Sequence, residues 1–81
     1  MRQTITTTRQ VGAILKARRK ARELSQDDIA TKLGISQPRL SVLESDPGGL
    51  TLSRLIVLTK LLGFALVLED ESTSDAPSVE W

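Results

Sequence analysis

The side chains around Ser36 and Gln37 have the chemistry needed to recognise the edges of DNA bases. The Gln37 amide can donate and accept hydrogen bonds in parallel, as adenine N6 and N7 require. Ser41 can donate or accept, and the ring of Pro38 can offer apolar contact, for instance to a thymine methyl group. A helix that enters the major groove N-terminus first presents its first turn and following outward positions to the bases. The pattern therefore predicts a base-reading helix that begins at Ser36.

Four further side chains could hold the sugar–phosphate backbone, which fixes the register of a protein on DNA but carries no sequence information directly. We predict this role for Ser25, Gln26, Lys32 and Arg39. Each also has a plainer interpretation. Ser25 and Gln26 could merely begin a helix, and Arg39 could be a solvated surface charge.

Two short helices joined by a tight turn are expected to position these side chains within residues 24–44. Ser25 and Asp28 have the spacing of a helix start, Ala30 is small enough for close helix packing, and Gly34 suits a left-handed turn. Apolar residues flank the turn on both sides: Ile29, Leu33, Ile35, Leu40 and Leu43. The pattern predicts a helix-turn-helix, and a generic α-helical hairpin is the alternative.

The rest of the chain predicts two more helices and a strand. One helix is expected to follow Thr7 and run to about residue 23, and another to follow Thr51 and close at Gly63. Residues 46–49 are expected to form a plain loop. The predicted organisation is a flexible N-terminus (1–6), a helix-turn-helix DNA-binding domain (7–63), a dimerisation strand (64–69) and an acidic flexible tail (70–81).

The predicted strand favours a homodimer. A lone strand leaves its backbone N–H and C=O groups unpaired, and this one is apolar on both faces. Antiparallel pairing with a second copy would satisfy the backbone and bury one apolar face. The strand residues are Phe64, Leu66, Val67 and Leu68. The alternative is that this segment merely continues the preceding helix.

The composition argues against catalysis and metal binding. A chain of 81 residues without Cys or His has no disulfide, no thiolate nucleophile and none of the usual zinc ligands. We therefore expect no enzyme, no catalytic residue, no metal and no cofactor. The longest apolar run, Leu61–Leu68, falls far short of the roughly 20 residues that a membrane span needs, so we expect a cytoplasmic protein without membrane contact.

Charge is segregated along the chain. Residues 1–43 contain nine Lys and Arg against three Asp and Glu, whereas residues 44–81 contain two against seven, so the halves carry net charges of +6 and −5. The basic half can meet a polyanion and the acidic half would be repelled by one. The basic run from Lys16 to Arg22 would spread around a helix, so its members cannot all face one duplex.

Through this helix-turn-helix pattern, the chain resembles the Cro/C1-type (XRE) repressor family over about residues 9–63. The resemblance is carried by Leu24, Ser25, Gln26, Ile29, Ala30, Leu33, Gly34, Ile35, Ser36, Leu40, Ser41 and Glu44. It implies a mainly α fold, a helix-turn-helix domain of four to five helices with one short C-terminal strand that pairs across a homodimer. It also implies an ion pair between Arg19 and Glu44 that holds the first helix to the end of the recognition helix.

Within that family the chain is similar to HipB-type antitoxins, small repressors of their own toxin–antitoxin operons. This similarity implies a bacterial, nucleoid-associated protein that binds a palindromic double-stranded operator as a homodimer. It also implies a HipA-type serine/threonine kinase toxin as partner, with Trp81 as the toxin-binding residue of the tail. Two alternatives stay open: a stand-alone or prophage-type repressor without a toxin, and a helical interaction module that does not bind DNA.

Overall fold

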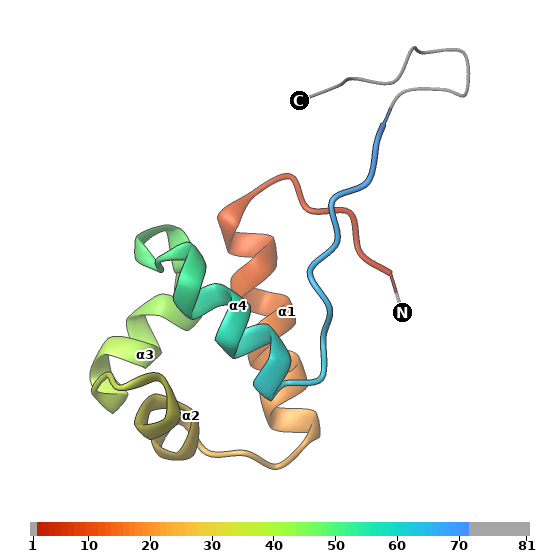
Figure 1. The fold of residues 1–81 in the computed structure, drawn as a ribbon. Helices are drawn as coiled ribbons and strands as arrows, with labels where there is room; N and C mark the ends of the chain where they lie inside the picture. The colour runs from red at the N-terminus through yellow and green to blue at the C-terminus, as the bar shows by residue number, and fades with distance from the viewer. Residues whose placement is uncertain (1, 72–81) are drawn as a thin grey trace.

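Each of the four α-helices begins at a hydroxyl residue whose side chain accepts a hydrogen bond from the helix backbone. The computed structural model describes residues 2–71, and α1 (Thr8–Ala21), α2 (Gln26–Leu33), α3 (Gln37–Ser45) and α4 (Leu52–Leu61) follow one another around one core (Figure 1). The capping residues are Thr7, Ser25, Ser36 and Thr51. Such caps satisfy backbone N–H groups that have no partner within the helix, so the helix starts follow directly from the sequence.

Left-handed residues end three of the helices. Gly34 after α2 has φ +72° and Gly63 after α4 has φ +80°, and in each case the next residue's N–H bonds back to the last turn. Glu23 adopts the same conformation after α1, with φ +58°, and the Leu24 N–H donates to the Arg19 carbonyl at 3.0 Å. These closures turn the chain sharply, and α2 packs against α3, while α1 packs on α3 and α4 packs on α2.

The core lies where the four helices meet. Ile29 of α2, Leu40 of α3 and Leu62 just after α4 are almost fully buried. The rest of the buried apolar cluster is Leu15, Ala30, Leu33 and Leu58. This arrangement confirms the predicted mainly helical helix-turn-helix fold, with α2 and α3 as the two motif helices.

The expectation of a plain loop at residues 46–49 is wrong. Pro47–Gly49 form a 3₁₀ turn, η1, between α3 and α4. The Asp46 carboxylate accepts hydrogen bonds from the Gly48 N–H at 3.1 Å and from the Thr8 hydroxyl at 2.8 Å. The Thr8 and Gly48 hydrogen bonds, with the nearby charge of Arg9, hold the pKa of Asp46 below its usual value. The turn thus has a cap of its own, which ties the end of α3 to the start of α1.

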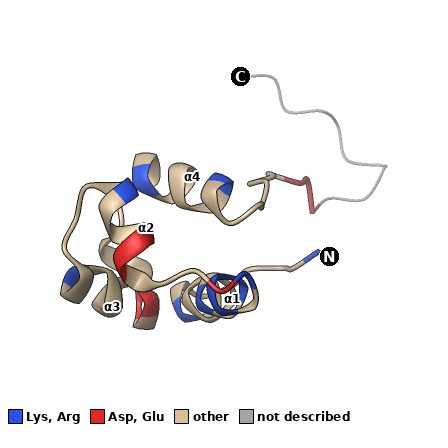
Figure 2. Ribbon diagram, turned by 90° about the horizontal axis from the view of Figure 1, so that it is seen from below, with Lys and Arg blue, Asp and Glu red and all other residues tan. Residues whose placement is uncertain are grey.

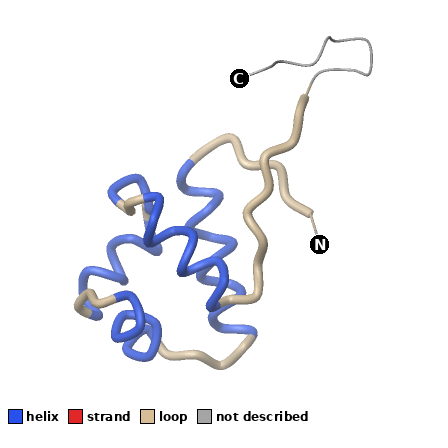
Figure 3. The backbone as a smooth tube through the Cα atoms, in the orientation of Figure 1, coloured by secondary structure: helices blue, strands red, loops and turns tan. Residues whose placement is uncertain are grey.

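After Gly63 the chain leaves the helical body as an irregular segment, and residues 65–68 are here called the arm. Within residues 2–71 no strand is present, as Figure 3 makes plain. A strand needs a neighbouring strand to complete its backbone hydrogen bonds, and the described residues 2–71 offer the arm none. The predicted pairing across a homodimer, and the domain boundaries based on it, stay predictions.

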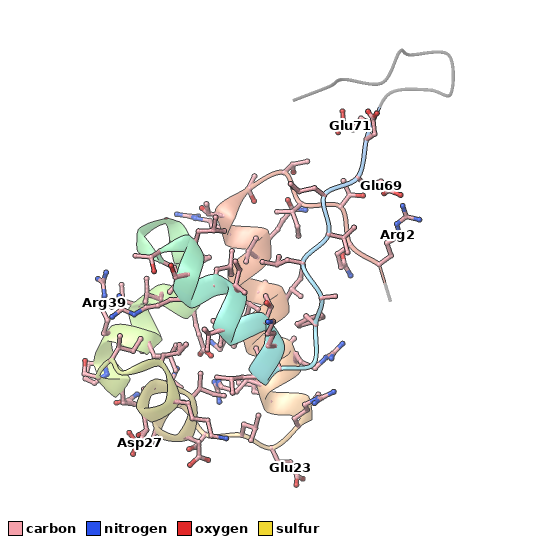
Figure 4. The ribbon with its side chains drawn as sticks, in the orientation of Figure 1. Arg2, Glu23, Asp27, Arg39, Glu69 and Glu71 are labelled. Carbon is pink, nitrogen blue, oxygen red and sulfur yellow. The ribbon has the colours of Figure 1, made fainter. Side chains whose placement is uncertain are left out.

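The exposed side chains of Arg2 and Glu69 form an ion pair between the two terminal segments (Figure 4). Residues 72–81 lie outside the described part of the chain. Most of the predicted acidic tail, including Trp81, therefore falls outside the description.

Candidate nucleic-acid interface

Helix α3 exposes the residues that the sequence predicts to read bases. Its buried positions are Leu40, Leu43 and Glu44, which turn toward the other helices. The cap residue Ser36 and the first-turn residues Gln37 and Pro38 are exposed. Ser41, one turn further along, is half-buried. The start of α3 therefore offers an amide, a hydroxyl and a proline ring to an incoming ligand.

Gln37 is held from behind by a neighbouring amide. Its Nε2 donates to Oε1 of Gln26 on α2, and Nε2 of Gln26 donates to Oε1 of Glu44 at 2.8 Å. A carboxylate only accepts, so the Gln26 amide must turn its NH₂ toward Glu44 and its carbonyl toward Gln37. The Gln37 side chain then still has an amide proton and a carbonyl oxygen to offer, the pair of groups that adenine requires.

A buried ion pair anchors this chain of hydrogen bonds. Arg19 of α1 donates to Glu44 twice, from Nε to Oε2 at 2.6 Å and from Nη2 to Oε1 at 3.1 Å. Its Nη1 donates to the Leu24 carbonyl at 2.9 Å. The two side chains are only 10% and 6% exposed. The pair that the family resemblance implies is thus present, and it connects α1, through α2, to the reading face of α3.

The four candidates for phosphate contact have different surroundings. Lys32 and Arg39 are exposed, and the Arg39 guanidinium lies beside Gly49 of η1. The Ser25 hydroxyl caps α2 by accepting from the Asp28 N–H at 3.0 Å. Gln26 is half-buried, and both groups of its amide already have partners inside the protein. The structure therefore gives Gln26 a further task, to orient Gln37, and the phosphate roles of all four stay predictions.

Lys and Arg residues are concentrated on α1 (Figure 2), but their side chains do not share one exposed face. Arg19 is buried, and Arg18 turns toward the end of α4, where its Nη1 donates to the Leu62 carbonyl at 3.0 Å. Lys16 and Lys20 are exposed. As expected from the helical circumference, only part of the basic run is available for long-range attraction of a polyanion.

Val42 lies beside the predicted reading residues but was not predicted from the sequence. This apolar residue of α3 is 60% exposed, whereas its apolar neighbours Leu40 and Leu43 are buried. Buried positions at 40, 43 and 44 leave 41, 42 and 45 outside, so the helical period could have revealed an apolar side chain beside Ser41.

Neither a metal site nor a membrane span is found among residues 2–71. No three His, Cys, Asp or Glu side chains of this region come together to hold an ion. None of its helices is long and apolar enough to cross a bilayer.

Comparisons with known proteins agree with this geometry. A family model described as helix-turn-helix matches residues 15–67. No curated protein matches the sequence. A chain of a HipA–HipB–O2–O3 complex is 27% identical, with a TM-score of 0.75 over 88% of this chain and 100% of that one. A chain of a HipB–O1–O2 complex is 28% identical, with a TM-score of 0.73 over 85% and 100%. A chain of a complex between a HipB variant and an O2 20mer is 26% identical, with a TM-score of 0.75 over 89% and 100%.

Proposed function

The chain belongs to the Cro/C1-type (XRE) helix-turn-helix family, and on that premise we propose that it is a HipB-type antitoxin. In this role it represses its own operon by binding a palindromic operator, and it binds and neutralises a HipA-type serine/threonine kinase toxin. It acts in the bacterial cytoplasm, at the nucleoid, because its operator lies there. The observation that carries the proposal is the exposed first turn of α3, in which Gln37 is oriented by Gln26 and the buried Glu44.

The reading chemistry follows from that first turn. Gln37 pairs with adenine through N6 and N7, Ser36 and Ser41 contact base edges, and Pro38 meets a thymine methyl group. Lys32 and Arg39, with the start of α2 at Ser25 and Gln26, hold phosphates on either side. An amide that is already oriented loses little freedom on binding, and this supports a base-reading role over a generic polar surface.

A homodimer supplies the second reading helix. Operators read by such folds have half-sites about 34–36 Å apart, so one monomer covers only half of the site. The chain exposes Ile56 and Val57 on α4, and Leu66, Val67 and Leu68 beyond it, an unusual set for a monomer. Antiparallel pairing of the two copies of residues 64–69 covers this surface.

Replacing Gln37 by Ala should weaken binding to the cognate operator by about 1–3 kcal/mol and leave non-specific binding unchanged. The base-edge hydrogen bonds are lost while the phosphate contacts stay. A mobility-shift titration on the DNA upstream of the gene, with scrambled DNA of equal length, measures both. Gln3→Ala, at another exposed glutamine, is the matched control and should change neither.

Two results would contradict the DNA-reading role. If Gln37→Ala weakens cognate and scrambled DNA equally, Gln37 reads no base. A DNA-binding protein loses affinity with salt, and the logarithm of its binding constant falls with log[salt] at about −0.9 per phosphate contacted. If the unaltered chain shows no such salt-dependent binding to DNA, the helical interaction module is favoured instead.

Replacing Trp81 by Ala should leave operator binding unchanged and weaken the toxin complex. Trp is a frequent anchor of protein interfaces, and truncating such an anchor commonly costs on the order of 2 kcal/mol or more. Calorimetric titration with the kinase encoded beside the gene measures the second effect. Unchanged toxin affinity would remove Trp81 from the interface. The lack of a kinase gene beside this one would favour a stand-alone repressor.

A further inference from the structure

Two arginines, Arg18 and Arg22, lie where α1 meets the end of α4. The proposed reading of DNA by α3 does not use them. Arg18 Nη1 donates to the Leu62 carbonyl at 3.0 Å. The same guanidinium lies over the ring of Phe64, with Cζ 4.0 Å from the ring centroid. Arg22, one turn later, packs so closely on Gly63 that a Cβ there would collide with the Arg22 guanidinium.

Residues 62–64 are therefore held more firmly than the arm that follows. Gly63 has φ +80°, and the Phe64 N–H donates to the Thr59 carbonyl at 2.8 Å, which closes α4. Phe64 packs against the core. In contrast, Leu66 is 53% exposed, Val67 76% and Leu68 fully exposed. Residues 62–64, here called the root of the arm, are thus fixed. The apolar side chains of the arm itself are not covered by any other part of the described chain.

We propose that Arg18 and Arg22 are positioning residues for self-association: they aim the arm at a second copy of the chain and bind the acids that follow that copy's arm. The proposal rests on the homodimer of the proposed function and adds to it the residues that set its geometry. Fixing the root removes conformational freedom that would otherwise be lost when two arms associate.

Charge complementarity identifies the second copy as the occupant. Three acids, residues 69–71, directly follow the arm. If the two arms pair antiparallel with residue 66 opposite residue 67, these acids lie opposite residues 62–64 of the other copy. Arg18 and Arg22 lie at that point, and Arg18 has further N–H groups beyond the one bound to Leu62, so it can donate to a carboxylate in addition.

The rest of this surface agrees with that occupant. A cavity of about 320 Å³ lies beside the root, lined by Ile56, Thr59, Lys60, Phe64, Ala65 and Leu66. Its apolar walls suit a leucine or valine of a second arm, and Lys60 adds a further cation. In the single chain Glu69 pairs with Arg2, but the Arg2 and Glu69 side chains are mostly exposed, at 76% and 63%. Exposed pairs contribute little stability, so Glu69 can exchange its partner on association.

The test compares the dimer dissociation constants of two variants of the full chain by sedimentation equilibrium. Arg18→Gln should raise that constant by about ten-fold, the loss that one charge-assisted hydrogen bond commonly causes. Lys20→Gln, on the exposed side of the same helix, removes the same charge and should leave the constant within about two-fold. Raising the salt from low to high should weaken the unaltered dimer and narrow the gap between the variants.

Arg18→Lys keeps the charge but loses the planar guanidinium. Its dimer dissociation constant should lie between those of the unaltered chain and Arg18→Gln. Circular dichroism establishes that each variant is helical before its association is measured. Equal dissociation constants for Arg18→Gln and Lys20→Gln would overturn the proposal and leave the homodimer of the proposed function intact. If the unaltered chain stays monomeric at high concentration, both the role of Arg18 and Arg22 and the homodimer itself are wrong. The test of base reading by Gln37 does not depend on that outcome.

Discussion

Replacing Arg19 by Met should lower the free energy of unfolding by about 3–5 kcal/mol, the usual cost of removing one partner of a buried ion pair. Glu44, whose side chain is 6% exposed, would keep only the hydrogen bond from Gln26. The Leu24 carbonyl would also lose its bond from Arg19. Urea unfolding followed by circular dichroism measures the change.

A double variant separates the stranded charge from simple loss of packing. Arg19→Met combined with Glu44→Leu leaves no buried charge, and such replacements are often neutral or stabilising. We expect it to recover most of the stability that Arg19→Met loses. Arg2→Met, in the exposed pair with Glu69, is the matched control and should change stability by less than about 1 kcal/mol. If Arg19→Met lowers the free energy of unfolding no more than Arg2→Met does, the buried ion pair contributes little to stability.

The same ion pair lies behind the reading face. Glu44 holds Gln26, and Gln26 holds Gln37, so the carboxylate that stabilises the fold also determines how the reading amide is presented. Three side chains from three helices thus fix the geometry of one exposed side chain. The domain's stability and its proposed specificity are coupled at Glu44.

Local signals in the sequence predict most of the helical fold. Thr7, Ser25, Ser36 and Thr51 are all found as helix caps, because a hydroxyl that accepts from the backbone two or three residues later acts within a single turn. The left-handed position of Gly34 is equally local. Gln37 is exposed because it lies in the first turn of α3, and not because of the helical period, since the buried Leu40 comes three residues later on nearly the same side.

The remaining features depend on contacts between distant residues, which spacing does not reveal. The 3₁₀ turn at Pro47 is stabilised by a hydrogen bond from Thr8, 38 positions before Asp46. Gln26 bonds to Glu44, 18 positions away, and Arg18 to Leu62, 44 positions away. The arm poses a different problem, because the partner proposed for its backbone is a second copy of the chain, which spacing within one sequence does not reveal.

Gly12 is a further position that the sequence analysis passed over, and replacing it by Val should lower the free energy of unfolding by about 3 kcal/mol. A glycine inside a helix normally costs roughly 1 kcal/mol relative to Ala, so its presence in the middle of α1 indicates a close approach. The structure has that approach: a Cβ at Gly12 would overlap the Glu44 carbonyl oxygen and lie 3.1 Å from Cδ of Pro47. Neither backbone nor a proline ring can move aside like a flexible side chain.

Side chains of increasing size at position 12 test whether steric overlap or helix propensity determines if the protein is destabilised or stabilised. Gly12→Ala should destabilise by about 1–2 kcal/mol, because its overlap with the Glu44 carbonyl outweighs the helix-propensity gain of roughly 1 kcal/mol. Ala13→Val places the same branched side chain on the exposed face of α1 and should cost only about 0.5 kcal/mol. If Gly12→Ala instead stabilises the protein, α1 has room to move from the end of α3. The overlap would then not be what requires glycine there, and the contact between the two helices would tolerate the shift.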